Sequence, residues 1–554
     1  MSEKQPINRT SNTQKNTSRQ RDNNVRLCLG VTLFGAAIAY WLMKSDITSA
    51  LGPKWDILSD KQYTLKAAER LSKAIQIDTR TFDGTPFDGS DPIYDNFYQF
   101  EKFLENQFPT IFKYLQHEMI NTHSHLFTWK GSKPDLKPVV FMAHIDTVPI
   151  LPDTISDWTF DPLSGKIAAD VRSDTPGTWI WGRGASDCKN SLMGIFGSIE
   201  KLIDEGYKPE RTILLINGHD EEIGGMRGDA QVAKLLEGRY GHDSVSLLVD
   251  EGFTGMTLEG DRFVAGLGMM EKGTMNVDIN IHSEGGHSSV PHEHNSIGVM
   301  AAVIRDLEAI PFTQTLKPEN PLAQYLDCLL EHNVTVPDQV KQGLAVKSKW
   351  PALTKWLIKD RVNRAFLSTT QAIDMIQGGI KYNALPEVVK TTINYRLAFD
   401  TTTSEVQKLI AKAVRPIAAN YGYGFSSFEH EKDKNQSGRS LSLPHIKLAI
   451  SDIEPILESA PPTPSDSLAF ALIGGTCKSM YGDDTVIAPT GMFANTDTRY
   501  MWNLTRHIFR FNPSLLTHNA GVHTTDERIS LEAHLNTTRF YYTLMHNLQG
   551  WQAD

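Results

Sequence analysis

Four segments of the sequence each pair an apolar run with side chains of the kind that bind metal ions. The run at residues 213–216 is broken by an Asn-Gly pair and followed by three carboxylates, Asp220, Glu221 and Glu222. Three other segments repeat this design: PVVFMAHID carries His144 and Asp146, TWIWGRGASD carries Asp187, and VSLLVDEG carries Asp250. A single acidic run is usually solvated surface. The repetition of one design in four places therefore indicates a site.

These side chains suit a pair of zinc ions held about 3.5 to 4 Å apart by a bridging carboxylate. Each ion would also need roughly two further ligands and an open position for a shared water. Asp187 is the best bridge, because it follows a turn containing Gly182 and Gly184 where the backbone can approach the ions closely. Glu222 and Asp250 are then predicted to bind one ion each.

Two more carboxylates are expected to act beside the metals without binding them. Asp146 lies one residue beyond His144, so it can accept a hydrogen bond from the ring nitrogen that is not on a metal and fix the tautomer. Glu221 is adjacent to Glu222 between two irregular turns. These turns let one carboxylate bind metal while the other stands off as the general base.

A second histidine ligand is also required. Eighteen histidines are present, and most should be surface or satisfied core residues. The segment HNAGVHTTDERI offers His518 and His523. We choose His523, because it opens the turn leading into a predicted helix that the acidic TDE run would cap.

The elements that must position these residues indicate an α/β fold. Near-continuous hydrophobic strands alternate with helical stretches, which predicts a mostly parallel sheet covered on both faces. Ligands of such sheets gather at the carboxyl ends of the strands, where all four segments would deliver their polar side chains. Amphipathic helices are predicted at residues 62–75, 93–104 and 192–202.

The hydrophobic period changes at Met275, which we take as a domain boundary. Apolar and polar residues alternate over 275–282, which predicts a sheet with one solvated face. Further strands at 389–397 and 453–457, with helices between them, would complete a ferredoxin-like α+β domain. The predicted organisation is a catalytic domain at 62–271 and 460–554, interrupted by a lid at 272–459 that carries an insertion of unassigned purpose at 311–370.

The N-terminus predicts a membrane anchor. Residues 1–26 are polar and basic, residues 27–43 are uncharged, and a polar tether follows at 44–61. About 17 to 25 apolar residues can span a bilayer, and the basic excess in front places the N-terminus in the cytosol. A cleavable signal peptide and a buried core helix are the competing interpretations. The candidate glycosylation sites are Asn333, Asn435, Asn503 and Asn536.

Composition excludes several classes of function. A chain of 554 residues that is 40% hydrophobic can bury a large core. Its formal charge of −10, without a basic stripe, argues against nucleic acid as a partner. The four cysteines are too scattered for a zinc knuckle and require no disulfide framework. The turn WGRGASDC lacks the third glycine of a dinucleotide-binding loop.

In this order, the segments resemble the co-catalytic di-zinc peptidases, a family that includes glutamate carboxypeptidase, aminoacylase and carboxypeptidase S, and above all its fungal carboxypeptidase S subgroup. The resemblance rests on MAHIDTVP, WGRGASDCKN, DEEIGG, LLVDEG, GGHSSVP, TTQAIDMIQGGIKYNALPE, NTDTRYMWNL and HTTDE. Each motif is weak alone, whereas the ordered series is highly specific. It implies that His144 and Asp250 bind one zinc ion, that Glu222 and His523 bind the other, and that Asp187 lies between them.

The resemblance also implies roles outside the metal site. Glu221 would be the proton shuttle, and His287 would reach an active site, often in a partner subunit, to polarise the scissile carbonyl. The second domain would then be a lid that supports a homodimer. Asn383 and Arg396 would hold the terminal carboxylate of the substrate, although the pattern alone favours an exposed surface arginine at Arg396. His219 has no expected role.

The sequence therefore predicts a membrane-anchored di-zinc carboxypeptidase that removes C-terminal residues from short peptides, of the Gly-Xaa type by resemblance. The short anchor resembles that of the carboxypeptidase S subgroup, which implies delivery to the vacuole lumen. An N-acyl-amino-acid amidohydrolase needs the same metals and the same grip on a carboxylate, so it stays an alternative. A non-catalytic lumenal receptor on this fold is a second alternative, against which the complete ligand set speaks.

Overall fold

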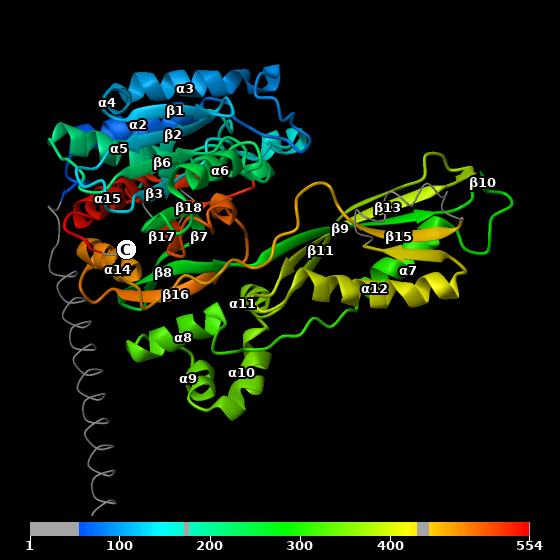
Figure 1. Cartoon of the computed structure of the whole chain (residues 1–554). Coiled ribbons are helices and arrows are strands. Elements are labelled where there is room, and N and C mark those ends of the chain that lie inside the picture. Colours follow the sequence, from blue (N-terminus) through cyan, green and yellow to red (C-terminus); the bar gives the residue numbers. More distant parts are fainter. Residues whose placement is uncertain (1–54, 171–174, 176, 429–442, 553–554) are drawn as a thin grey trace, which may run out of the picture.

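The computed structural model describes residues 55–170, 175, 177–428 and 443–552 (Figure 1). The predicted membrane span at 27–43 and the sequon residue Asn435 lie outside these residues. Among the helices of the described part, none is long and apolar enough to cross a bilayer.

An eight-stranded mixed sheet forms the body of the molecule, in the order β1-β2-β6-β3-β7-β17-β8-β16. Its strands are β1 (Gln116–Ile120), β2 (Ser124–Trp129), β3 (Val139–Met142), β6 (Ile213–Asn217), β7 (Leu247–Glu259), β8 (Arg262–Glu271), β16 (Val486–Met492) and β17 (Ile508–Leu515). The central strands β6, β3, β7 and β17 run parallel. The β1 and β2 edge and the β7–β8 pair are antiparallel. The sheet is mixed and not mostly parallel: its centre and the β8–β16 pair are parallel and its other pairings are antiparallel. The prediction is wrong in this respect, because hydrophobic runs do not reveal strand direction.

Helices cover both faces of this sheet. Alternate residues of its central strands therefore belong to two different hydrophobic cores. Phe141 and Leu215 belong to one core, and Val140 and Leu214 belong to the other. The first core is closed by α2 (Lys61–Ile75), α3 (Asp95–Gln107), α4 (Pro109–Tyr114), α5 (Lys189–Asp204), α14 (Leu468–Tyr481) and α15 (Leu531–Asn547). The second is closed by α6 (Asp229–Tyr240). The helices predicted at 62–75, 93–104 and 192–202 are confirmed as α2, α3 and α5.

The strand before Asp187 departs from the prediction. β5 (Thr178–Trp181) belongs to a separate four-stranded sheet with β4 (Lys166–Ala169), β18 (Asn519–Ala520) and β19 (Arg528–Ser530). Its pairings are antiparallel. A four-residue apolar run is equally compatible with a small peripheral sheet and with a central strand, so the sequence could not separate them.

A second sheet, in the order β11-β13-β9-β15-β14, extends away from the body (Figure 1). Its strands are β9 (Gly273–His282), β11 (Thr370–Gly378), β13 (Val388–Leu397), β14 (Gly424–Ser427) and β15 (His445–Ile450), with the helices α7 (Ser296–Glu308) and α12 (Thr403–Asn420) packed on it. Without β14, this order is that of the predicted ferredoxin-like arrangement. The last strand is β15 and not residues 453–457, where Ile453 and Ile456 are exposed.

The insertion at 311–370 is helical. It comprises α8 (Pro321–Glu331), α9 (Asp338–Leu344), α10 (Trp350–Leu357) and α11 (Arg361–Leu367) around a small core of their own. Cys328 and Leu329 of α8 pack against Val486 and Ala488 of β16. The insertion therefore covers the edge of the main sheet beside the lid.

Candidate metal centre and substrate cavity

Ligand atoms from β3, β7 and the loop after β5 meet at one point. His144 lies just beyond β3, and its Nε2 is 3.0 Å from Asp187 Oδ1 and 3.3 Å from Glu251 Oε1. Cys188 lies beside them, and its Sγ accepts a hydrogen bond from the His144 N–H at 3.1 Å. Ligand atoms of these four residues lie within 4.8 Å of one another.

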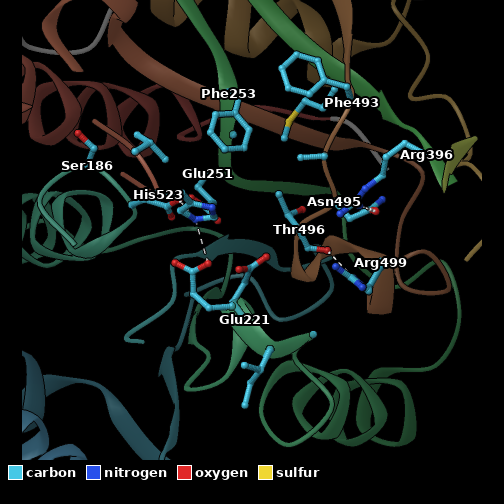
Figure 2. A pocket seen from close by; sticks show the side chains of 18 of the residues that line it. Ser186, Glu221, Glu251, Phe253, Arg396, Phe493, Asn495, Thr496, Arg499 and His523 are labelled. Carbon is cyan, nitrogen blue, oxygen red and sulfur yellow. Dashed lines mark hydrogen bonds and ion pairs between the residues drawn. The ribbon is translucent and has the colours of Figure 1, made fainter. Parts of the chain in front are cut away.

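A second group of ligand atoms shares Asp187 with the first. His523 Nε2 lies 3.0 Å from Asp187 Oδ2 and 3.1 Å from Glu222 Oε2. Each oxygen of the Asp187 carboxylate thus faces a different histidine, as expected of a carboxylate that bridges two cations. Figure 2 shows His523 and Glu251 on one side of the cavity, with Glu221 below them.

Glu251, and not the predicted Asp250, joins His144. Both residues lie in β7, where successive side chains point to opposite faces of the sheet. Among the described residues, Asp250 belongs to neither ligand group. It is buried instead, and burial raises the pKa of its carboxyl well above the usual value. The sequence DEG shows two adjacent carboxylates but does not show which of them faces the site.

Asp146 holds the turn that carries the two adjacent glutamates. Its carboxylate accepts hydrogen bonds from the backbone N–H groups of Glu221 and Glu222, each at 3.1 Å, and from Thr81 Oγ1 at 2.8 Å. His144 Nδ1 lies 2.9 Å from the Asp146 carbonyl oxygen and 3.3 Å from its carboxylate. The tautomer of His144 is therefore set by the main chain as well as by the carboxylate.

Glu527 holds the loop that carries Asp187 in the same way. Its carboxylate accepts from the backbone N–H groups of Gly184, Ser186 and Asp187 at 3.0, 2.9 and 3.1 Å. It also pairs with Arg183 at 2.7 Å. The acidic TDE run thus supports this loop and does not cap a helix, because α15 begins at Leu531 with Ser530 as its N-cap.

The carboxylates of the site are crowded and partly unpaired. Burial and the nearby Asp187 raise the pKa of Glu222 to about 8. Burial also raises the pKa of Glu221 and of Glu251. Although burial opposes it, hydrogen bonds from His144 and His523 bring the pKa of Asp187 well below its usual value. Within the described residues, the buried Oε1 of Glu222 meets no hydrogen-bond partner.

Both ligand groups open on a cavity of about 710 Å³. Arg396 lines it, and donates to Asn495 Oδ1 at 2.7 Å and to Asn394 Oδ1 at 3.2 Å. Arg499 lines the same cavity (Figure 2), and it pairs with Glu454. Arg396 is therefore not the surface arginine that its pattern alone favours.

His287 and Asn383 lie away from this cavity. His287 belongs to β10 (Gly286–His287), which pairs with β12 (Ala384–Leu385). Figure 1 places β10 at the end of the lid far from the body. Neither residue is among the described residues that line the cavity. Within one chain, the structure does not bring them to the site.

The sequon residues differ in exposure. Asn536 is buried in α15, which corrects its prediction as a glycosylation site, because a glycan is bulky and needs solvent. Asn333 and Asn503 are exposed. The sequon is a local sequence pattern and contains no information about burial, so it could not show that Asn536 lies on the buried face of α15.

His219, which had no expected role, is part of the core. Its Nδ1 lies 2.7 Å from Ser124 Oγ, and its ring packs edge-on against Tyr94. Burial lowers the pKa of His219 to about 3, so it is a neutral packing residue.

Among the cavity residues that sequence reasoning missed besides Glu251 are Asn495, Phe253 and Phe493. Asn495 opens the NTDTRYMWNL motif, which contributes to the family resemblance but by itself predicts no role for Asn495. Phe253 lies two residues beyond Glu251, so the choice of Glu251 in place of Asp250 would have pointed to it.

Comparison with known proteins identifies the family. A model described as peptidase family M20/M25/M40 matches residues 140–547. The chain belongs to this family. Carboxypeptidase S of Saccharomyces cerevisiae is 35% identical over 89% of this chain and 86% of its own length. The mouse N-fatty-acyl-amino acid synthase/hydrolase is 30% identical over 87% of this chain and 88% of its own. The resemblance predicted from the motifs is confirmed.

Solved structures of M20 peptidases share the fold. An M20 family metallo-carboxypeptidase from Sulfolobus solfataricus superposes with a TM-score of 0.58 at 15% identity, covering 88% of this chain and 99% of its own. Membership of the M20/M25/M40 family implies a metal cofactor, typically zinc. The donor set fits such a metal: two histidines and three carboxylates converge, and one buried carboxylate oxygen has no other partner among the described residues.

Proposed function

We propose that the protein is a zinc-dependent carboxypeptidase that removes the C-terminal residue from short peptides. The observation that carries this proposal is the sharing of Asp187 between two ligand groups on a cavity that Arg396 also lines. Two zinc ions would be held, one by His144 and Glu251 and the other by Glu222 and His523, with Asp187 common to both.

The residues around the cavity have separate tasks in this reaction. Zinc ions in such a site polarise a carbonyl and lower the pKa of a water molecule. Glu221 lines the cavity, and among the described residues it belongs to neither ligand group. It is placed to take a proton from the attacking water and to deliver it to the leaving amine. Asp146 fixes Glu221 through its backbone N–H.

Arg396 and Asn495 would orient the substrate by its terminal carboxylate. A guanidinium is a strong partner for a carboxylate, because the bond between them is charge-assisted. Asn495 Oδ1 accepts from Arg396, and its Nδ2 donates to the Lys272 carbonyl, which fixes the amide. Recognition of a free carboxylate confines cleavage to the last bond of a peptide, and glycine before that bond is the preference implied by resemblance.

An N-acyl-amino-acid amidohydrolase is the second candidate, because the mouse relative carries that kind of name at 30% identity. The zinc-loaded chain should be assayed with Gly-Leu and with N-acyl leucine, before and after chelation. We expect a higher kcat/KM on Gly-Leu, lost with the chelator and restored by zinc. A higher kcat/KM on N-acyl leucine would favour the second candidate. Hydrolysis of neither would favour a non-catalytic receptor.

We further propose a homodimer through the lid. β11 is an edge strand, and its Met375 and Ile376 are 58% and 60% exposed. A second subunit would let His287 and Asn383 act at its cavity, as the resemblance implies. The test mixes two inactive variants, His287→Ala and Glu221→Gln. Mixed dimers should regain activity, since one of their sites has both groups intact. Monomers in solution, or mixtures that stay inactive, would contradict the dimer.

We also propose that residues 27–43 anchor the protein in a membrane, with the catalytic part in the vacuole lumen. The support is the uncharged composition of this segment and the basic residues before it. Asn333 and Asn503 are the exposed sequons of the described part. Resistance to alkaline carbonate extraction and a glycosidase-sensitive mass are expected. A soluble protein of unmodified mass would oppose this proposal.

A further inference from the structure

Two phenylalanine rings form one side of the cavity. Phe253 and Phe493 both line it, and their side chains are 44% and 38% exposed. The rings stack with centroids 6.2 Å apart and an interplanar angle of 14°. We name this pair the aromatic wall. Exposing a large apolar side chain to water is unfavourable in free energy. An aromatic surface inside a reaction cavity therefore indicates that an apolar part of the substrate packs against it.

The aromatic wall lies between the metal ligands and the carboxylate-binding group. Phe253 is two residues beyond Glu251 on β7, and both residues line the cavity. Phe493 is two residues before Asn495, the partner of Arg396. Figure 2 shows the wall along the side of the cavity from Glu251 to Arg396, opposite Glu221.

The covalent structure of the substrate relates these positions. The Cα of a C-terminal residue bonds to the nitrogen of the scissile amide and to the terminal carboxylate. With the scissile carbonyl at the metal ligands and the carboxylate at Arg396, this Cα lies between the two, and its side chain leaves from there. The acyl side of the bond extends away from Arg396.

We propose that the aromatic wall is the subsite for the side chain of the C-terminal residue and that it selects large apolar side chains of the leucine and phenylalanine class. This inference rests on the carboxypeptidase function proposed above. Desolvation of an aliphatic or aromatic side chain against two rings favours leucine over alanine. It disfavours aspartate, whose charge would lose water without gaining a partner from the rings.

The helical insertion supports the aromatic wall. Phe366 of α11 contacts Phe493 with ring centroids 5.8 Å apart at 79°, and stacks on Phe399 at 6.3 Å. The Phe366 carbonyl accepts from Asn320 Nδ2 at 3.1 Å, which ties α11 to the start of α8. Phe366 is therefore a positioning residue that reaches the substrate only through Phe493, and this contact gives the insertion a role.

The test measures kcat/KM of the zinc-loaded full chain on Gly-Leu, Gly-Phe, Gly-Ala and Gly-Asp. For the natural chain we expect Gly-Leu to exceed Gly-Ala by about 10-fold or more. Phe253→Ala and Phe493→Ala should each bring this ratio close to one, with a larger loss of kcat/KM on Gly-Leu than on Gly-Ala. Tyr114→Ala is the matched control, because Tyr114 is 60% exposed on α4 and does not line the cavity.

Phe366→Ala should reduce the Gly-Leu to Gly-Ala ratio while metal content and kcat on Gly-Ala stay unchanged, and Phe366→Leu should restore the ratio. If Phe366 had a purely structural role, Phe366→Ala would lower kcat/KM on Gly-Leu and on Gly-Ala to the same extent. If the natural chain cleaves these dipeptides but the Gly-Leu to Gly-Ala ratio is unchanged in Phe253→Ala and Phe493→Ala, the proposed subsite is contradicted. The proposed carboxypeptidase function would still stand. If the wall variants change selectivity between short and long N-acyl leucines instead, the wall serves the acyl side. If the zinc-loaded chain cleaves none of these substrates, both proposals fail.

Discussion

His144 Nε2 lies 3.3 Å from Glu251 Oε1, whereas Asp250, the preceding residue of β7, is in neither group of ligand atoms among the described residues. Glu251→Gln should therefore lose one zinc ion per chain, and Asp250→Asn should keep both. Burial raises the Asp250 pKa, so the neutral amide matches the group that it replaces. Metal analysis of the purified variants measures this. Loss of zinc from Asp250→Asn alone would restore the ligand expected from the sequence.

Glu221→Gln should keep its zinc and lose at least ~100-fold in kcat on Gly-Leu, because the amide cannot accept the proton of the water. Asp83→Asn is the matched control, since Asp83 also lines the cavity and, among the described residues, belongs to neither ligand group. Turnover of Glu221→Gln close to that of the control would remove Glu221 from the proton transfer.

Arg396→Met should raise KM for Gly-Leu and leave hydrolysis of Gly-Leu amide unchanged, because only the free carboxylate uses the guanidinium. A hydrogen bond to a charged group contributes about 1.5 to 3 kcal/mol, so kcat/KM on Gly-Leu should fall roughly 10- to 150-fold. Arg305→Met, at an exposed arginine of α7, is the control. Equal losses on both substrates would mean that Arg396 supports the fold and not the carboxylate.

The sequence predicts a metal ligand well where a segment offers only one suitable side chain, and less well where it offers two. His144, Asp187, Glu222 and His523 come together as expected. Only His144 and Glu222 follow strands of the main sheet, whereas Asp187 and His523 reach the site from the smaller sheet of β4, β5, β18 and β19. The choice between Asp250 and Glu251 depends on the phase of β7, and an all-apolar strand buried on both faces carries no phase in its pattern.

The remaining errors have other origins. The last lid strand, β15, is amphipathic, with His445 and Lys447 alternating with apolar residues. The sequence predicts the strand at 453–457 instead, because Ile453 and Ile456 make that stretch look more apolar, although both are exposed. For Arg396, the alternation of β13 predicts which face of the strand carries the side chain. It does not predict that this face lines a cavity and is not exposed to solvent. The aromatic wall joins Phe253 and Phe493 from two segments far apart in sequence, and Phe366 of a third segment supports it, so no local pattern predicts it.

His534 should make the fold less stable in mild acid. It is buried against Asn190, and burial lowers its pKa to about 4 from 6.5. The unfolded chain therefore binds a proton first as pH falls, and stability is lost between about pH 6.5 and about pH 4, at no more than about 1.4 kcal/mol per pH unit.

The Tm measured with chelator from pH 7 to pH 5 should fall less in His534→Gln than in the natural chain, since the chelator removes the pH dependence of metal binding. His242→Gln, at a histidine whose side chain is 66% exposed, is the control and should follow the natural chain. Parallel Tm curves for His534→Gln and the natural chain would assign the acid sensitivity to other groups.

A zinc titration of the metal-free chain determines whether two cations share Asp187. We predict saturation at two zinc ions per chain, with Gly-Leu hydrolysis appearing as the sites fill, and loss of both tight sites in Asp187→Asn. Saturation at one zinc ion, or two tight zinc ions retained by Asp187→Asn, would contradict the shared carboxylate.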